Sequence, residues 1–446
     1  MSVALSMLGT SPVLVPLTTA MLAALAVDRP RLQAALSYAG IAVFVACGIA
    51  LVTLAQADTE LRVAFGDWPP PFGIEFAIDR VGAALVLITA LMGAATLLFL
   101  ASDADAPPPA PLLLPLVHGL LAGVGGAFAT ADLFNLYVWF EVMLICSLGL
   151  LAIGGQLRQL DATLKYLVLS LIGTLLLLIG VALTYGLTAH LNFDALARAA
   201  PLVSPAALLP VLAVLLLALL IKAGAFPLFA WLPASYHTLP AALLALFAGL
   251  LTKVGVYGVL RLMADVFVPV PALLYEALGW IAAATMLLGV IGAAYHWDMR
   301  RILAFHIISQ IGYILLGVAL ASEQGNAATV FYTIHHIIVK ANLFLIAAIV
   351  FRLTGQYDLR RIGGLYGLRP WLGLLFLVPA LSLVGVPPLS GFWAKLLVLE
   401  EAIAQGRIAW TVIALIVSVL TLYSMMKIWM EAFWKSHPDA TWSPPA

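Results

Sequence analysis

Apolar runs dominate this chain of 446 residues and constrain its fold more than any other feature. A helix needs about 20 apolar residues to cross the hydrocarbon core of a bilayer. Runs of about that length lie near 3–27, 32–56, 77–101, 112–131, 133–154, 162–186, 206–236, 240–264, 272–294, 301–321, 327–351, 372–400 and 408–431. We therefore expect an all-α polytopic membrane protein with about thirteen transmembrane helices.

The composition agrees with a membrane protein and excludes other classes. Hydrophobic residues make up 64% of the chain and charged residues only 9%, against about 25% charged residues in an average soluble domain. A formal net charge of zero gives no overall attraction to nucleic acid. Cys47 and Cys146 have no metal-ligand spacing, so we expect no cofactor and no metal site. Met1–Val27 lacks a basic leader, and we expect a retained first helix rather than a cleaved signal peptide.

The distribution of Lys and Arg over the connecting loops predicts the orientation in the membrane. With the N-terminus outside, the inside loops hold eleven basic residues and the outside loops hold five. Because loops rich in Lys and Arg stay inside, we expect a multi-pass protein of the cell (inner) membrane with the N-terminus outside and the C-terminus inside. Asp58–Glu75 is then predicted to be an ordered outer loop with a short hairpin, and Leu187–Pro205 a second outer connection.

Glycine and proline interrupt two of the apolar runs, around Pro227 and around Pro387. Proline removes a backbone donor and clashes with the preceding turn, so both helices should break inside the membrane. The two prolines are 160 residues apart (387 − 227), and the runs that begin near 112 and 272 have the same spacing. This spacing predicts two five-helix repeats, and the second must be inverted because five is odd. Broken helices at matching positions of inverted repeats mark a transport site.

These observations predict a division of the chain into four parts. We expect N-terminal helices with an outer loop over 1–111, a first five-helix bundle over 112–264, a second, inverted bundle over 272–431, and a polar tail over 432–446.

Four of the seven lysines lie deep in apolar runs: Lys222, Lys253, Lys340 and Lys395. An ammonium group at the centre of a bilayer costs roughly 2.5–3.5 kcal/mol on insertion scales, and such groups usually mark an ion or proton pathway. Glu141 is the acidic residue predicted well inside a span. It is the expected partner of Lys222, either for proton exchange or as a static ion pair that fixes helix packing.

Histidines accompany one of these lysines. His335, His336 and Lys340 share one helix, and His336 and Lys340 share a face at i, i+4. Because histidine titrates near neutral pH, it can shuttle protons, and His306 is a further relay candidate. The alternative for Lys253 and for Lys395 is that each side chain reaches a membrane surface. Arg261, two turns after Lys253, is expected to anchor its helix at the outer interface.

Several long motifs occur in an order that resembles one protein family. KAGAFPLFAWLP, ALFAGLLTKVGVYGVLR, RRILAFHIISQIGYILLGVAL, HHIIVKANLFLIA and VPPLSGFWAK resemble the proton-translocating membrane subunits shared by respiratory complex I and Mrp-type cation/proton antiporters. DLFNLYVWFEVML together with LLTKVGVYG is most similar to the D-type group of Mrp-type Na+/H+ antiporter subunits.

The resemblance implies two inverted five-helix bundles, each with a half-channel and a discontinuous helix, joined by a central polar axis. It implies proton-translocation roles for Glu141, Lys222, Lys253, His335, His336, Lys340 and Lys395. The partners would be other membrane subunits of a multisubunit antiporter or a complex I-like assembly. The chain departs from the family pattern because a polar tail, Lys435–Ala446, stands where a fourteenth helix is usual. This departure puts the usual contact with a neighbouring subunit in question.

We therefore expect a proton-translocating subunit of a multisubunit monovalent cation (Na+)/H+ antiporter, and not an enzyme. Because Glu141 is the only deep acid in the sequence, Na+ is expected to cross elsewhere. The first alternative is the antiporter-like pumping subunit of an NADH:quinone oxidoreductase or membrane hydrogenase, in which the same residues would move protons. The others are an autonomous solute transporter and a membrane scaffold whose four deep lysines are individually replaceable.

Overall fold

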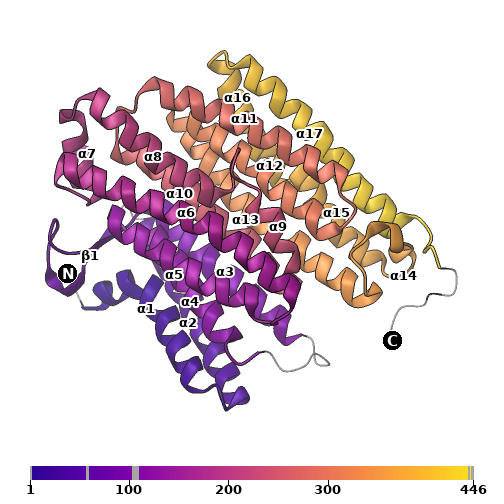
Figure 1. Ribbon diagram of the computed structural model, residues 1–446. Helices are drawn as coiled ribbons and strands as arrows, with labels where there is room; N and C mark the ends of the chain where they lie inside the picture. The colour runs from indigo at the N-terminus through magenta and orange to yellow at the C-terminus, as the bar shows by residue number, and fades with distance from the viewer. Residues whose placement is uncertain (1–2, 57–59, 103–109, 440–441, 443–446) are drawn as a thin grey trace. The chain divides into compact units, whose positions relative to one another are not determined.

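The computed structural model describes residues 3–56, 60–102, 110–439 and 442, and these residues are mostly helical (Figure 1). The helices are α1 (Val3–Leu25), α2 (Pro30–Ala55), α3 (Arg80–Ala101), α4 (Leu113–Ala129), α5 (Leu133–Ala152), α6 (Leu157–Thr188), α7 (Phe193–Ala199), α8 (Pro205–Ala223), α9 (Trp231–Ser235), α10 (Ala241–Arg261), α11 (Ala272–Tyr295), α12 (Met299–Ala319), α13 (Glu323–Thr354), α14 (Leu365–Leu368), α15 (Pro370–Val384), α16 (Ser390–Ala404) and α17 (Ile408–Ile428). Short 3-10 turns lie at Phe65–Asp67, Ala200–Leu202, Tyr236–Thr238 and Leu359–Arg361, and π-helical turns at Leu262–Val266 and Trp429–Trp434.

The helical segments fall on the apolar runs of the sequence. Within the described ranges, eleven helices are long and apolar enough to cross a membrane, and the shorter apolar helices α4 and α15 add two more. The predicted all-α polytopic fold is therefore confirmed. The largest shifts are at α6 and α13, which begin four or five residues before their predicted starts. Polar caps cause both extensions, because Gln156 forms a capping box at α6 and Ser322 accepts a hydrogen bond from Gly325 N at α13.

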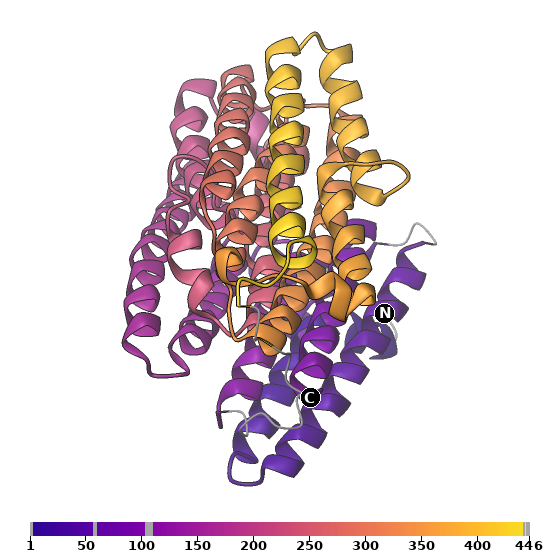
Figure 2. The same cartoon turned by 90° about the vertical axis from the view of Figure 1, so that its right-hand side faces the viewer.

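The described chain divides into two compact units. Unit 1 comprises Met1–Lys222 with Tyr257–Pro271, and unit 2 comprises Ala223–Val256 with Ala272–Ala446. In unit 1, α4 packs against α1, α3 and α5, and α5 also packs against α6. In unit 2, α12 packs against α11 and α13, while α16 packs against α13, α15 and α17; Figure 2 shows α16 and α17 side by side.

A two-stranded hairpin follows α2 in unit 1. Strands β1 (Leu61–Ala64) and β2 (Glu75–Ile78) are antiparallel, with Leu61 opposite Ile78. Their side chains alternate between buried and half-buried positions, as the period of a strand requires. The hairpin predicted from the sequence is present, although the start of that predicted segment, Asp58, lies outside the described residues.

Both predicted helix breaks are present. α8 ends at Ala223 and is followed by Gly224 with φ +74°, and α15 ends at Val384 and is followed by Gly385 with φ +96°. Glycine adopts this left-handed conformation without the steric penalty that a Cβ would bring. Each helix then resumes, as α9 or as α16, after a short non-helical stretch that contains Pro227 or Pro387.

A connection in unit 1 is repeated in unit 2 at a spacing of 166 residues. α6 and α13 each have 32 residues and begin 166 residues apart (323 − 157). The backbone hydrogen bonds Leu133 N to Leu191 O and Phe193 N to Ala131 O recur as Met299 N to Tyr357 O and Leu359 N to Trp297 O. We call these two connections the first elbow (131–133 with 191–193) and the second elbow (297–299 with 357–359). The spacing falls to 161 at the breaks (385 − 224), because α15 has 15 residues and α8 has 19.

Candidate functional site

Lys222 lies in the last turn of α8, immediately before the first break, and is 9% exposed. Its Nζ donates a hydrogen bond of 2.9 Å to the carbonyl oxygen of Ser170 in α6, and it lies 5.6 Å from the centroid of the Phe140 ring. Gly173 of α6 lies beside this contact, and a Cβ there would lie 3.4 Å from Lys222 Cε and 3.0 Å from Ile221 Cγ2. A neutral carbonyl and an aromatic face therefore hold this ammonium group.

Glu141 is half-buried on α5, directly after Phe140. Its charge acts on Lys222, but among the described residues no ion pair joins the two side chains. The static ion pair considered from the sequence is therefore not formed in this structure. The carboxylate acts on Lys222 at a longer range.

Lys253 of α10 and Lys340 of α13 lie in unit 2 and are both fully buried. Lys253 Nζ donates to Ala248 O at 2.5 Å, and Lys340 Nζ donates to Leu303 O of α12 at 3.1 Å. Because Lys253 turns back along its own buried helix, it does not reach a membrane surface. The charges of the two lysines act on each other, and two ammonium groups in an apolar interior repel.

The adjacent histidines of α13 face different neighbours. His335 Nδ1 lies 2.9 Å from Ser390 Oγ at the start of α16, while the charges of Lys253 and Lys340 act on His336. Neighbouring residues of a helix point about 100° apart, which explains the divergence. In the described part of the chain neither ring nitrogen of His336 has a hydrogen-bond partner. A buried polar group without a partner is costly, and such groups call for a functional explanation.

Lys395 of α16 follows the second break and is 5% exposed. Its Nζ donates to Val384 O at 2.7 Å and to Ser418 Oγ of α17 at 3.0 Å. It also lies 4.8 Å from the centroid of the Tyr313 ring. These contacts hold the side chain in the interior of unit 2, so Lys395 does not extend to the surface.

Sequence reasoning missed a stripe of polar residues on α12. His306, Ser309, Gln310 and Tyr313 are all fully buried, and their spacing of three and four residues places them on one helix face. His306 Nε2 lies 2.5 Å from Ser424 Oγ of α17, and Gln310 Oε1 accepts a bond of 2.6 Å from Tyr332 of α13. Polar residues at this spacing in an otherwise apolar helix indicate a buried polar face, but only His306 is a candidate from the sequence alone.

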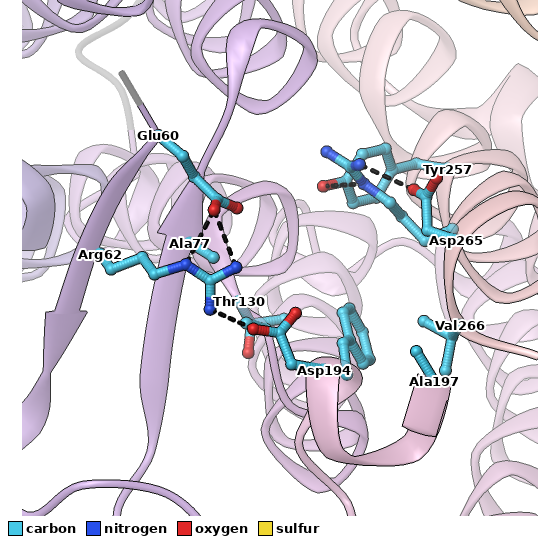
Figure 3. A pocket seen from close by; sticks show the side chains of 12 residues that line it. Glu60, Arg62, Ala77, Thr130, Asp194, Ala197, Tyr257, Asp265 and Val266 are labelled. Carbon is cyan, nitrogen blue, oxygen red and sulfur yellow. Dashed lines mark hydrogen bonds and ion pairs between the residues drawn. The ribbon is translucent and has the colours of Figure 1, made fainter. Parts of the chain in front are cut away.

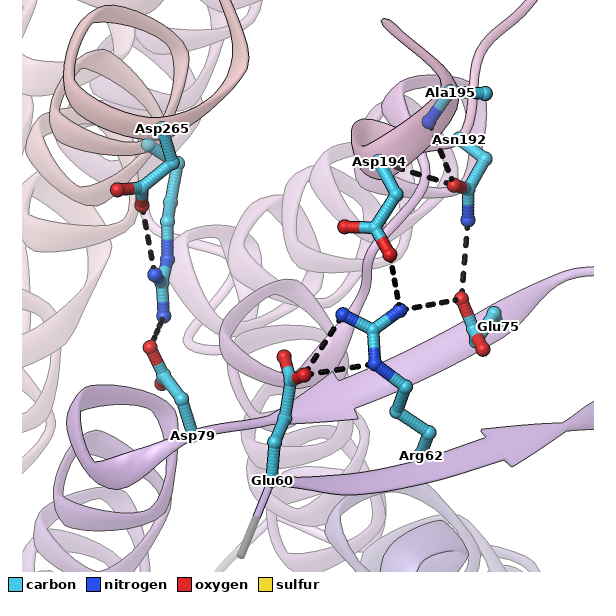
Figure 4. Close-up of polar contacts among 9 residues, drawn as sticks. Glu60, Arg62, Glu75, Asp79, Asn192, Asp194, Ala195 and Asp265 are labelled. Atoms are coloured by element: carbon cyan, nitrogen blue, oxygen red, sulfur yellow. Dashed lines mark hydrogen bonds and ion pairs between the residues drawn. The ribbon is translucent and has the colours of Figure 1, made fainter. Parts of the chain in front are cut away.

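A second polar region lies in unit 1, beside the first elbow (Figure 3). It is a pocket of about 190 Å³. Its lining residues are Glu60, Arg62, Ala77, Thr130, Ala131, Phe193, Asp194, Ala197, Tyr257, Arg261, Asp265 and Val266. Arg62 forms ion pairs with Glu60 at 2.7 Å, Asp194 at 2.5 Å and Glu75 at 3.3 Å (Figure 4). Burial would lower the pKa of Arg62, but its hydrogen bonds to Asp194 and Glu60 raise that pKa above its ordinary value.

Arg261 lines the same pocket. It forms ion pairs with Asp79 at 2.5 Å and with Asp265 at 2.8 Å, and its Nε donates to the Tyr257 hydroxyl at 2.9 Å. Since Asp79 also caps α3, Arg261 ties the end of α10 to the start of α3. Asp79 and Asp265 therefore hold the guanidinium at the end of α10, and its role as an anchor at the outer interface stays a prediction.

Comparison with known proteins agrees with the family suggested by the motifs. The family described as NADH:quinone oxidoreductase/Mrp antiporter, TM, matches residues 130–421. The chain is 39% identical over 424 residues to the D-type subunit of the Na(+)/H(+) antiporter of Alkalihalophilus pseudofirmus, and the match covers 95% of this chain and 86% of that protein.

Solved structures agree as well. A chain of the Mrp complex from Dietzia sp. DQ12-45-1b is similar at a TM-score of 0.92 and 36% identity, over 98% of this chain and 81% of that one. A chain of the membrane-bound sulfane sulfur reductase, an archaeal respiratory membrane complex, is similar at a TM-score of 0.91 and 26% identity, over 99% of this chain and 91% of that one. The chain belongs to the family of transmembrane subunits shared by NADH:quinone oxidoreductases and Mrp antiporters.

Proposed function

We propose that this chain is a proton-translocating membrane subunit of a multisubunit monovalent cation (Na+)/H+ antiporter. One observation carries the proposal. Lys222, Lys253, Lys340 and Lys395 are buried, and in the described chain each donates to neutral oxygens and none forms an ion pair. Burial without a counter-charge disfavours the ammonium form, so such a lysine can give up and regain a proton. The similarity to the D-type antiporter subunit of Alkalihalophilus pseudofirmus and to a chain of the Mrp complex from Dietzia supports the same function.

The proton path follows the buried ionisable groups. A proton reaches Lys222 in the first bundle, where the charge of Glu141 modulates its affinity. It passes by Lys253 to His336 and Lys340, whose charges act on one another, so that a proton gained by one favours release by the next. It leaves by Lys395, with His335 and His306 as relays. One charge moved across 100 mV is worth about 2.3 kcal/mol, which is the scale of such local interactions.

The path is built on two inverted bundles, 112–264 and 272–431, preceded by the helices of 1–111 and followed by the tail 432–446. The matching lengths of α6 and α13 and the repeated elbow support this division. Each bundle contains a break, at Pro227 or Pro387, where helix ends and freed carbonyls can bind ions. The excess of basic residues in alternate loops supports an N-terminus outside and a C-terminus inside.

The partners are other membrane subunits in the cell membrane, and the transported ions are protons exchanged for a cation such as Na+. A second candidate is the antiporter-like subunit of a redox-driven complex, which the similarity to the sulfane sulfur reductase chain favours. Co-purification decides between them, because flavin or iron–sulfur subunits would accompany the chain only in the redox complex. An autonomous transporter would move solute as a lone chain, and a scaffold would tolerate loss of each buried lysine.

Proton movement by the intact complex in proteoliposomes tests the proposal. Lys222→Ala and Glu141→Ala should each abolish proton movement while the complex still assembles. Lys165→Ala is the matched control, since Lys165 is exposed and paired with Asp161 at 2.5 Å, and it should transport as the wild type does. Retained transport in both Lys222→Ala and Glu141→Ala, in complexes of normal composition, would refute the scheme.

A further inference from the structure

The surroundings of Lys395 offer an ammonium group two hydrogen-bond acceptors and an aromatic face. Two protons point to Val384 O and Ser418 Oγ, and the charge lies over the ring of Tyr313. An ammonium has three N–H donors and no acceptor, so this site suits the charged form. A neutral amine would instead have two N–H donors and one lone pair, and the lone pair would need a donor.

The hydrogen bonds beyond Ser418 run in one direction. Ser418 Oγ lies 2.8 Å from the Tyr313 hydroxyl, and Tyr313 donates a short hydrogen bond to Ala414 O. A tyrosine hydroxyl has one hydrogen, and Tyr313 uses it on Ala414. Ser418 must therefore donate to Tyr313, and the order of donation is Lys395, Ser418, Tyr313 and the carbonyl of Ala414.

Tyr313 also changes what Ser418 can do. A serine within a helix commonly donates back to the carbonyl four residues earlier, which for Ser418 is Ala414. In the described chain Ser418 does not make that bond, because Tyr313 occupies the same carbonyl oxygen. The hydrogen of Ser418 is thus kept available for a partner outside its own helix.

We propose that Ser418 and Tyr313 are positioning residues that reverse their hydroxyl hydrogen bonds each time Lys395 gains or loses its proton. When the N–H bond breaks, the electron pair stays on Nζ and the proton passes to water on the exit side. Tyr313 then turns its hydrogen from Ala414 O to Ser418, and Ser418 donates to the lone pair of Nζ. Each hydroxyl keeps one hydrogen throughout, and both states of Lys395 are hydrogen-bonded. This inference rests on the proposed function and deepens it.

Among the groups around Lys395, the hydroxyl groups of Ser418 and Tyr313 are the ones whose hydrogen bonds can reverse. α16 packs against α12, α13, α15 and α17. His306 of α12 and His335 of α13 are the titratable groups that face Lys395 from these helices, and the charge of Lys395 acts on both. α15 has no charged residue, and Lys427 of α17 lies more than two turns beyond Ser418.

The first test is Tyr313→Phe, measured as the pH dependence of proton movement by the intact complex in proteoliposomes. The ring stays, so the contact with the ammonium is kept, while Ser418 becomes free to bond back to Ala414. Ser418 then only accepts, and the neutral lysine loses its donor. We expect transport about tenfold slower and an optimum displaced to higher pH by about one unit, the scale of one hydrogen bond to a charged group.

The second test is Ser418→Ala, which removes an acceptor from the ammonium and a donor from the neutral amine. Because the hydrogen bond to the charged form is the stronger of the two, the optimum should move the opposite way, to lower pH. Ser418→Thr keeps a hydroxyl and should retain the wild-type pH dependence. Two controls lie on the same helix. Thr421→Val changes a buried hydroxyl that donates to Val417 O of its own helix, and Tyr423→Phe changes an exposed ring; both should transport normally.

Opposite displacements in Tyr313→Phe and Ser418→Ala would support the inference, because loss of packing alone has no reason to move the optimum in two directions. Unchanged optima, or displacements in the same direction, would overturn it. If only one of the two variants assembles, its own direction decides: to higher pH for Tyr313→Phe, or to lower pH for Ser418→Ala. Lys395→Ala separates the two levels. If it transports, the exit step of the proposed function fails together with this inference; if it is inactive while both hydroxyl variants keep the wild-type profile, only this inference fails.

Discussion

The two broken helices solve the same backbone problem in different ways. At the second break, the backbone closes on itself, since a Cβ on Gly391 would lie 1.7 Å from the carbonyl oxygen of Ser382. At the first break, side chains fill the space, since a Cβ on Gly224 would meet Leu232 Cδ1 at 3.2 Å and Trp231 at 3.7 Å. The second break is therefore held by backbone contact and the first by packing that can adjust.

The lysines beside the breaks differ in the same sense. Lys222 precedes its break, donates to a carbonyl and lies within the field of Glu141. Lys395 follows its break and donates to one carbonyl and one hydroxyl group. A repeated backbone has thus been given two chemical environments. The repeated backbone therefore sets where each helix breaks, and individual side chains set the chemical surroundings of each break.

Gly391→Ala should have the largest effect on stability. The new methyl group would overlap a backbone oxygen and lie 2.9 Å from His335 Cε1, so α15 and α16 would have to separate. We expect a loss of about 3 kcal/mol or more, against roughly 1–2 kcal/mol for Gly224→Ala, where the positive φ is the main cost. Thermal unfolding of the purified complex measures both. Gly186→Ala in α6 is the control, because nothing lies within 4 Å of its Cβ position. Equal losses at the two breaks would contradict the comparison.

The loss of stability in Arg62→Ala should depend on salt, whereas the loss in Arg300→Ala should not. Ion pairs of a half-exposed Arg62 secure the first elbow. Arg300 at the second elbow lies 3.8 Å from the centroid of the Tyr357 ring, and its ion pair with Asp298 is longer, at 3.4 Å, and less exposed. We expect Arg62→Ala to cost about 1 kcal/mol at low salt and almost nothing at about 1 M salt, because ions screen exposed pairs. Arg300→Ala should cost about 1–2 kcal/mol at both concentrations. Thermal unfolding in detergent at two salt concentrations measures this, and a similar salt dependence for both variants would refute the distinction.

Removing the caps of the elbows should have a smaller and more equal effect. Asp132 accepts from Asn135 N at 2.8 Å at the start of α5, and Asp298 accepts from Arg300 N at 2.9 Å at the start of α12. Replacement of either by alanine leaves helix N–H groups without a partner and should cost about 1 kcal/mol. Asp→Asn at each position is the matched control, because asparagine also caps. If the alanine variants unfold at the wild-type temperature, the elbows are not held by these caps.

Apolar length and turn residues predicted most of this fold, because they act locally. Runs of about 20 apolar residues form helices, and the segments in which a proline follows a glycine by two or three residues form the breaks. The partners of the lysines were not predictable in the same way. Ser418 and Val384 reach Lys395 from other segments, and neither differs in the sequence from many residues that contact nothing polar. The static ion pair that was the alternative for Lys222 and Glu141 is not formed, since sharing an apolar region does not bring two side chains within bonding distance.

Removing the charge of Asp132, the cap of the first elbow, has the smallest predicted effect on stability, and this effect depends on pH. Burial raises the pKa of the Asp132 carboxyl above its ordinary value, although hydrogen bonds from Asn135 and Phe134 lower it in part. The unfolded chain therefore gives up this proton more readily than the folded protein, and the contribution of Asp132 to stability is full at low pH and is lost as the pH rises.

Asp132→Asn keeps the capping oxygen without the charge. It should raise the unfolding temperature slightly at about pH 7.5, and the gain should shrink as the pH approaches about 4, where the ordinary carboxyl protonates. Asp132→Ser, a second uncharged cap, should show the same trend. A gain that does not change with pH would mean that the charge of Asp132 is not what opposes folding there.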